Sequence, residues 1–180
     1  MNLPNKLTVF RVILIPFFLF FLLNSEGNNL YLAISLVIFC VACITDYFDG
    51  YIARKHNLIT NFGKFMDPIA DKLLVNSAII SLLAINQIGV LVTIIIICRE
   101  ILISGFRLVA VSNNIVIAAG PWGKRKTVVQ MIMVIYLLTG LQNLSPTFEY
   151  IGVALTYAGA LLAIISGYDY IIKNLDVLKD

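Results

Sequence analysis

Charged residues are scarce in this sequence of 180 residues. Only 13% of the residues are Asp, Glu, Lys or Arg, whereas 60% are hydrophobic, and the mean hydropathy is +0.94. This composition lies well outside the range of soluble globular proteins. The chain is therefore predicted to be an integral membrane protein, and we expect no nucleic acid among its partners.

Histidine and cysteine, the softer metal ligands, are also rare. His56 is the only histidine, which excludes a zinc site with two histidine ligands and argues against a Ser/His or Cys/His nucleophile. The three cysteines lie in apolar segments. Cys40 and Cys43 have CxxC spacing, but no second pair of ligands accompanies them. We interpret the cysteines as packing residues and His56 as a solvated loop residue.

Apolar segments long enough to cross a bilayer recur along the chain. A hydrocarbon core of roughly 30 Å requires about 20 apolar residues in a helix. Six segments qualify, alone or with amphipathic extensions: 7–23, 29–45, 69–86, 88–111, 127–142 and 150–172. The sequence thus predicts an all-α bundle of six transmembrane helices with cytosolic extensions, forming a single domain over residues 1–180. A signal peptide over 6–23 is the competing interpretation, but no small-residue cleavage site follows it.

The positive charges predict an orientation for these helices. Six spans place residues 46–72, 99–126 and both termini on one side of the membrane. All 13 Lys and Arg residues fall on that side, whereas the opposite connections carry only Glu26 and Glu149. By the positive-inside rule, the positively charged side faces the cytosol.

Four aspartates lie where the second and third segments meet this cytosolic side. Asp46 and Asp49 are three positions apart, and Asp67 and Asp71 are four apart, so each pair shares one face of a helix. Carboxylates at a membrane boundary are costly unless a cation neutralises them. Two helix ends can therefore present four carboxylates to a shared cation. We expect Pro68 in the first turn of the third helix, where its missing N–H costs little.

An all-oxygen set of ligands favours Mg²⁺ or Mn²⁺ over softer metals. Such a cation suits phosphate substrates, because it bridges phosphoryl oxygens and stabilises their charge. Gly50 and Gly63 lack a side chain, so a ligand or a neighbouring helix can approach the backbone there. In the alternative interpretation, the aspartates pair with basic residues as solvated charge. The residues available for this are Arg54, Lys55, Lys64 and Lys72.

The complete pattern resembles the signature of the CDP-alcohol phosphotransferases. It reads D-x2-D-G-x2-A-R-x8-G-x3-D-x3-D and begins at Asp46. This family consists of integral membrane enzymes that cleave the pyrophosphate of a CDP-linked donor and pass the phosphoryl-bearing part to an alcohol. The resemblance implies that Asp71 is the general base and that Gly50, Arg54 and Gly63 line the CDP site. The implied ligands of Mg²⁺ or Mn²⁺ are Asp46, Asp49, Asp67 and Asp71.

Three further segments are similar to one branch of this family, the bacterial phosphatidylglycerophosphate synthases. They cover residues 2–16, 99–110 and 123–127. The branch uses CDP-diacylglycerol and sn-glycerol 3-phosphate and releases CMP and phosphatidylglycerophosphate. The resemblance implies a bacterial cell membrane, an active site facing the cytosol, and a homodimer surrounded by membrane lipids. It also implies that the donor site includes Asn5, Thr8 and Arg11.

A phosphorylated acceptor requires cations distinct from the metal. A basic group on the predicted cytosolic side provides them, although ordinary positive-inside charge is an alternative explanation. The candidates for binding the acceptor phosphate are Arg107 and Lys126, followed by Arg99 and Lys124.

Two other functions stay open from the sequence. The same donor can serve a different acceptor, namely inositol phosphate, serine or phosphatidylglycerol. Acids at a membrane boundary also occur in ion transporters. A transporter should place its acids near the bilayer midplane and often has inverted repeats, whereas here the acids cluster at the cytosolic edge without visible repeat symmetry.

Overall fold

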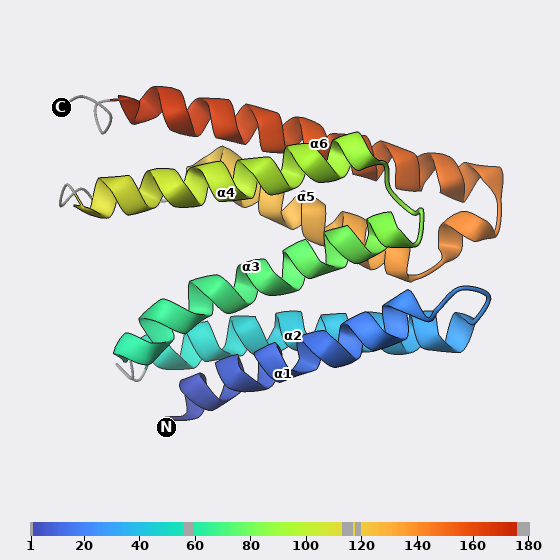
Figure 1. Ribbon diagram of the computed structural model, residues 1–180, viewed down its shortest axis with the longest axis horizontal. Coiled ribbons are helices and arrows are strands. Elements are labelled where there is room, and N and C mark those ends of the chain that lie inside the picture. The colour runs from blue at the N-terminus through green and yellow to red at the C-terminus, as the bar shows by residue number, and fades with distance from the viewer. Residues whose placement is uncertain (1, 56–59, 113–116, 118–119, 176–180) are drawn as a thin grey trace. The chain divides into compact units, whose positions relative to one another are not determined.

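The computed structural model describes residues 2–55, 60–112, 117 and 120–175, and the regular structure within these ranges is helical (Figure 1). The prediction of an all-α protein with six long helices is confirmed for this part of the chain. The helices are α1 (Leu3–Leu23), α2 (Asn29–Lys55), α3 (Asn61–Ala84), α4 (Val90–Ser112), α5 (Pro121–Leu138) and α6 (Pro146–Lys173), with a short 3-10 helix, η1 (Leu141–Asn143).

Within the described ranges, three helices are long and apolar enough to cross a membrane by length and composition alone. They are α1, the stretch Asn29–Ile52 of α2, and α6. Charged residues interrupt the apolar pattern of the other helices, such as Lys72 in α3 and Arg99 in α4. The described residues thus form six long helices, while the membrane crossing of α3, α4 and α5 stays a prediction.

Helix α3 begins earlier than the sequence predicts. Thr60 is its N-cap, and the Thr60 hydroxyl accepts a hydrogen bond from the Gly63 N–H at 3.0 Å. Because this cap satisfies a free backbone donor well before residue 68, the helix starts at Asn61. The prediction that Pro68 lies in the first turn is therefore wrong. A proline at the first position does occur in α5, which begins at Pro121.

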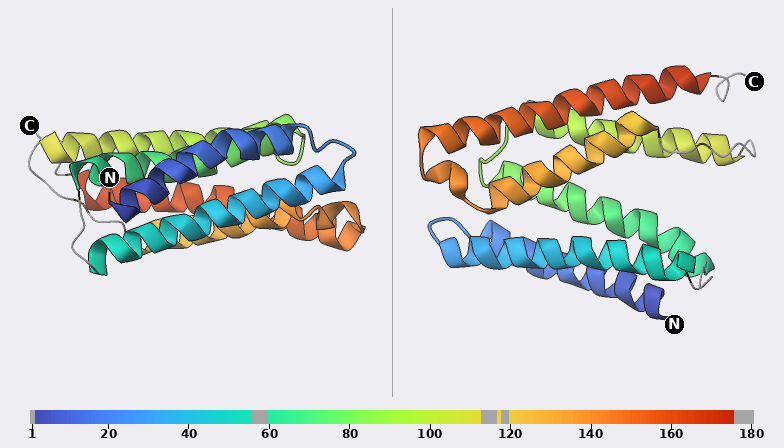
Figure 2. Two further views of the ribbon diagram at one scale, coloured as in Figure 1. Left: turned by 90° about the horizontal axis from the view of Figure 1, so that it is seen from below. Right: turned by 180° about the vertical axis from the view of Figure 1, so that it is seen from behind.

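The chain divides into two compact units, and unit 1 comprises residues 1–87 and 135–140. Successive helices α1, α2 and α3 run antiparallel, and α1 packs against both of the others (Figures 1 and 2). Phe18 of α1 and Phe39 of α2 are fully buried, with ring centres 5.7 Å apart. Gly140 has a φ of +71°, and a Cβ there would lie 2.9 Å from Leu32 Cδ2, so this position favours glycine.

Unit 2 comprises residues 88–134 and 141–180, and its helix α6 packs against α4. The buried face of α6 is rich in small residues, which allow helices to pack closely. Two of them permit close approach. A Cβ at Gly159 would lie 3.3 Å from Met133 Sδ on α5, and one at Gly167 would lie 3.3 Å from Arg99 Cγ on α4. The small residues of α6 therefore bring the Arg99 side chain against this helix.

Candidate active site

Two aspartates of α2 share one cation from α1. Arg11 Nη1 lies 2.6 Å from Asp46 Oδ1, and Arg11 Nη2 donates a hydrogen bond to Asp49 Oδ2. The Arg11 side chain is fully buried and that of Asp49 is 3% exposed, whereas that of Asp46 is 42% exposed. The two carboxylates therefore converge, as their spacing predicts, and one of them remains accessible.

Asn5 and Thr8 lie on the same buried face of α1 as Arg11. The Thr8 hydroxyl donates a hydrogen bond to the Pro4 carbonyl at 3.1 Å and lies 3.5 Å from Asp49 Oδ2. The family resemblance thus selected three residues that the fold directs toward α2 and α3. Their contact with a CDP-linked donor stays a prediction.

Thr60 links the start of α3 to α1. In addition to capping Gly63, its hydroxyl donates a hydrogen bond to Asn5 Oδ1 at 2.9 Å. One side chain therefore caps α3 and connects its start to α1. Sequence reasoning did not single out Thr60. The available signal was a threonine directly before a helical segment, which is typical of an N-cap.

The other signature residues lie along α2 and α3. Gly63 is buried, and Gly50 and Asp71 are half-buried. Asp71 comes within electrostatic range of Cys43 on α2, as does Asp46. Helix α3 thus brings a third carboxylate into this region. The described side chains do not include Arg54, His56 and Asp67.

The donor atoms here suit a hard divalent cation. Asp46 and Asp49 carry two negative charges and Arg11 one positive charge, so these three groups retain a net charge of −1. Among the described side chains, no group of three His, Cys, Asp or Glu residues lies close enough to hold a metal. The predicted set also needs Asp67, whose side chain is outside that description. Binding of Mg²⁺ or Mn²⁺ stays a prediction that the converging carboxylates support.

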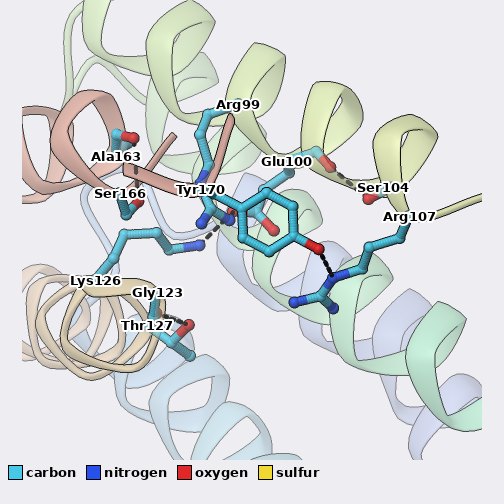
Figure 3. Close-up of polar contacts among 10 residues, drawn as sticks. All are labelled: Arg99, Glu100, Ser104, Arg107, Gly123, Lys126, Thr127, Ala163, Ser166 and Tyr170. Atoms are coloured by element: carbon cyan, nitrogen blue, oxygen red, sulfur yellow. Dashed lines mark hydrogen bonds and ion pairs between the residues drawn. The ribbon is translucent and has the colours of Figure 1, made fainter. Parts of the chain in front are cut away.

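A second polar site joins α4 to α5 in unit 2 (Figure 3). Glu100 of α4 accepts hydrogen bonds from Arg99 Nη1 at 3.0 Å and from Lys126 Nζ on α5. Little of these side chains is exposed: 5% for Lys126 and 14% each for Arg99 and Glu100. One carboxylate therefore serves two largely buried cations.

Arg107 lies seven residues after Glu100, about two turns further along the same face of α4. Its Nε donates a hydrogen bond to the Tyr170 hydroxyl of α6 at 3.2 Å, and its guanidinium lies 5.5 Å from the centre of the Tyr170 ring. Phe106 packs edge-on against the same ring, with the ring centres 5.8 Å apart. Helix α6 thus holds the third cation. The basic cluster is defined here as Arg99, Glu100, Arg107, Lys126 and Tyr170.

Three of the four residues predicted to bind the acceptor phosphate belong to this cluster, while the fourth, Lys124, is exposed on α5. The sequence reasoning missed Glu100 and Tyr170. A signal existed for Glu100, because it is the only acidic residue between Asp71 and Glu149 and stands among basic residues. No local pattern distinguishes Tyr170 from the other tyrosines of α6.

The family assignment comes from comparison with known sequences. The profile described as CDP-alcohol phosphatidyltransferase matches residues 1–165, which include the aspartate site and every residue of the basic cluster except Tyr170. The chain belongs to this family. The match confirms the resemblance inferred from the aspartate signature, and it identifies the protein as an enzyme.

Curated relatives carry a more specific name within the family. The chain is 40% identical to the CDP-diacylglycerol–glycerol-3-phosphate 3-phosphatidyltransferase of Bacillus subtilis over 99% of this chain and 97% of that protein. A protein of the same name from Rickettsia typhi is 39% identical over 94% of each chain. Another from Mycoplasma pneumoniae is 38% identical over 74% of this chain and 66% of its own.

Proposed function

We propose that this protein transfers the phosphatidyl group from CDP-diacylglycerol to sn-glycerol 3-phosphate, forming phosphatidylglycerophosphate and releasing CMP. The observation that carries the proposal is the 40% identity to the Bacillus subtilis transferase over nearly the full length of both proteins. The two polar sites supply the complementary charges that this reaction needs. One is acidic and suits a metal-bound pyrophosphate, and the other is basic and suits a phosphorylated acceptor.

The donor end of the reaction is assigned to the signature residues. When bound by Asp46, Asp49, Asp67 and Asp71, Mg²⁺ or Mn²⁺ would neutralise charge on the pyrophosphate and lower the pKa of the acceptor hydroxyl. Arg11 holds Asp46 and Asp49 in one orientation, which limits the reorganisation needed on binding. Gly50 and Gly63 leave room for the nucleotide next to the backbone.

Asp71 accepts the proton of the acceptor hydroxyl in this mechanism. The acceptor oxygen then forms a bond to the phosphorus that carries diacylglycerol, and the bond from that phosphorus to the CMP oxygen breaks. Arg54 stabilises the negative charge that develops on CMP. Arg107 and Lys126 hold the phosphate of the acceptor, with Arg99 and Lys124 around them.

The same proposal covers location and assembly. Three apolar helices and the bacterial relatives support a multi-pass protein of the bacterial cell membrane. The positive-inside rule directs the active site to the cytosol, and the family resemblance favours a homodimer. Light scattering of the purified protein in detergent would test the dimer. The expected protein mass is twice that of the 20.0 kDa chain.

A direct assay tests the function. Purified protein in detergent, supplied with CDP-diacylglycerol, should release CMP when sn-glycerol 3-phosphate and Mg²⁺ or Mn²⁺ are both present, and EDTA should abolish the release. A panel with inositol phosphate, serine and phosphatidylglycerol tests the acceptor. Higher turnover with any of these three would replace glycerol 3-phosphate as the assigned acceptor. Ion flux into proteoliposomes without release of CMP would contradict the proposed transferase activity.

Variants test the assigned roles. Asp71→Asn and Asp67→Ala should each lower CMP release by about 10³-fold, since one removes the proton acceptor and the other a metal ligand. Glu26→Gln is the matched control, because Glu26 is an exposed acid in the connection between α1 and α2. Wild-type rates in either aspartate variant would refute the role assigned to that residue.

A further inference from the structure

Glu100 occupies an unusual position for an acid in a site assigned to a phosphate. Its carboxylate is 14% exposed and contacts both Arg99 and Lys126, which are two of the cations predicted to bind the anion. A carboxylate at this place repels a phosphate by Coulomb's law, so its presence requires an explanation. Figure 3 shows the Lys126 amine directed at Glu100.

The net charge of the cluster offers part of an explanation. Arg99, Arg107 and Lys126 contribute three positive charges and Glu100 one negative charge, which leaves +2. A phosphate monoester carries roughly −1.5 to −2 charges near pH 7. The basic cluster therefore matches the charge of a phosphate monoester only if Glu100 is counted.

The orientation of the basic side chains offers the other part of the explanation for Glu100. A lysine has a long flexible side chain that loses rotamer entropy when a ligand fixes it, and a carboxylate that already holds the amine removes that loss. Glu100 holds Lys126 from α5 and Arg99 from α4, and the Tyr170 hydroxyl holds Arg107 from the Nε side. In addition, Arg99 Nε is buried and has no hydrogen-bond partner among the described residues. An anionic oxygen would satisfy a donor of this kind.

We infer that Glu100 and Tyr170 are positioning residues that pre-orient Lys126, Arg99 and Arg107 to bind the phosphate of the acceptor. This inference rests on the proposed function for the identity of the acceptor. The two residues do not touch the reacting atoms. Their effect is to fix three cations from α4 and α5 before the ligand arrives.

The direction in which KM for glycerol 3-phosphate changes in Glu100→Gln separates a positioning role from simple charge balance. Glu100→Gln removes a negative charge while keeping the size of the side chain. If Glu100 only balanced charge, the extra positive charge would bind the phosphate more tightly and lower KM for glycerol 3-phosphate. If Glu100 positions the cations, KM for glycerol 3-phosphate rises by about tenfold or more, because Lys126 and Arg99 lose a charge-assisted partner. KM for CDP-diacylglycerol should change less than about twofold.

Tyr170→Phe is a second variant that tests the contact with Arg107. It deletes only the hydroxyl and keeps the ring that Arg107 and Phe106 contact, so the packing of α6 is preserved. We expect KM for glycerol 3-phosphate to rise about threefold to tenfold, the effect of one lost hydrogen bond to a charged group. Glu100→Asp should recover part of the affinity lost in Glu100→Gln, because it restores the carboxylate.

Asp169→Asn is the matched control for Glu100→Gln. It also changes an acid to an amide in unit 2 and also breaks an ion pair with a lysine, since Asp169 Oδ1 lies 2.6 Å from Lys173 Nζ. That lysine is 61% exposed and belongs to no assigned site, so both KM values should stay at the wild-type level.

Thermal protection makes the test independent of the reaction. Glycerol 3-phosphate should raise the unfolding temperature of the wild-type protein, glycerol should not, and Glu100→Gln should lose most of the increase. If the wild type releases no CMP with glycerol 3-phosphate but is still protected by it, the proposed function fails and the positioning role stands. An absence of protection in the wild type, or an unchanged or lower KM in Glu100→Gln, overturns the positioning role.

Discussion

The two polar sites of this protein bury charge in opposite ways. In unit 1, one guanidinium, that of Arg11, serves the carboxylates of Asp46 and Asp49. In unit 2, one carboxylate, that of Glu100, serves the cations of Arg99 and Lys126. Each site is therefore compensated only in part, and the first retains a negative charge while the second retains a positive one.

This difference explains how a membrane protein can keep ligand sites without isolated buried ions. A fully unpaired charge away from water is costly, whereas a fully paired one has little remaining attraction for a ligand. Two like charges that share one opposite charge avoid both the cost of an unpaired charge and the loss of attraction for a ligand. Under the proposed function, the remaining negative charge of the acidic site attracts a divalent cation, and the remaining positive charge of the basic cluster attracts a phosphate.

Removing the shared cation of the acidic site should produce the largest effect. Arg11→Met keeps much of the side-chain volume but leaves Asp49 buried without its cation, which costs about 3–5 kcal/mol of stability when one partner of a buried pair is removed. CMP release should fall by about 10²-fold, because the carboxylates lose their fixed orientation. Thermal unfolding and CMP release measure the two effects.

Arg11→Lys serves as the comparison, since it returns a positive charge without the two-pronged guanidinium. Its stability and activity should lie between those of Arg11→Met and the wild type. If Arg11→Met were as stable and as active as the wild type, the ion pairs with Asp46 and Asp49 would have no role in the site.

A double-mutant cycle in the basic cluster should show an intermediate effect. Lys126→Met should raise KM for glycerol 3-phosphate about tenfold to a hundredfold, since it deletes a charge-assisted contact with the phosphate. The double variant with Glu100→Gln should raise KM much less than the product of the two single fold-changes, because both substitutions act through the same amine. Strict additivity would show that Glu100 acts independently of Lys126.

Lys124 should give the smallest effect. Its side chain is exposed on α5, and an exposed charge beside a binding site contributes little because water and salt screen it. Lys124→Ala should raise KM for glycerol 3-phosphate by no more than about threefold. The increase should shrink further at high salt. An increase as large as that in Lys126→Met would place Lys124 in direct contact with the acceptor.

Local patterns in the sequence were sufficient for much of the fold. Apolar segments of about 20 residues predict helices whatever their neighbours are, because the hydrogen bonds of a helix are internal to it. The spacing of Asp46 and Asp49 likewise places both on one face of α2 from helical geometry alone. Helix α3 begins earlier than the sequence pattern predicts, because the Thr60 hydroxyl caps the Gly63 N–H.

The sequence by itself thus determined the helices, the faces that carry the aspartates, and the family to which the chain belongs. Only the tertiary structure decided the partners of the charged side chains. Arg11 reaches Asp49 across 38 positions, Lys126 reaches Glu100 across 26, and Arg107 reaches Tyr170 across 63. Helical periodicity relates residues within about two turns, so pairings between helices depend on packing, here including the contact of Arg99 with Gly167.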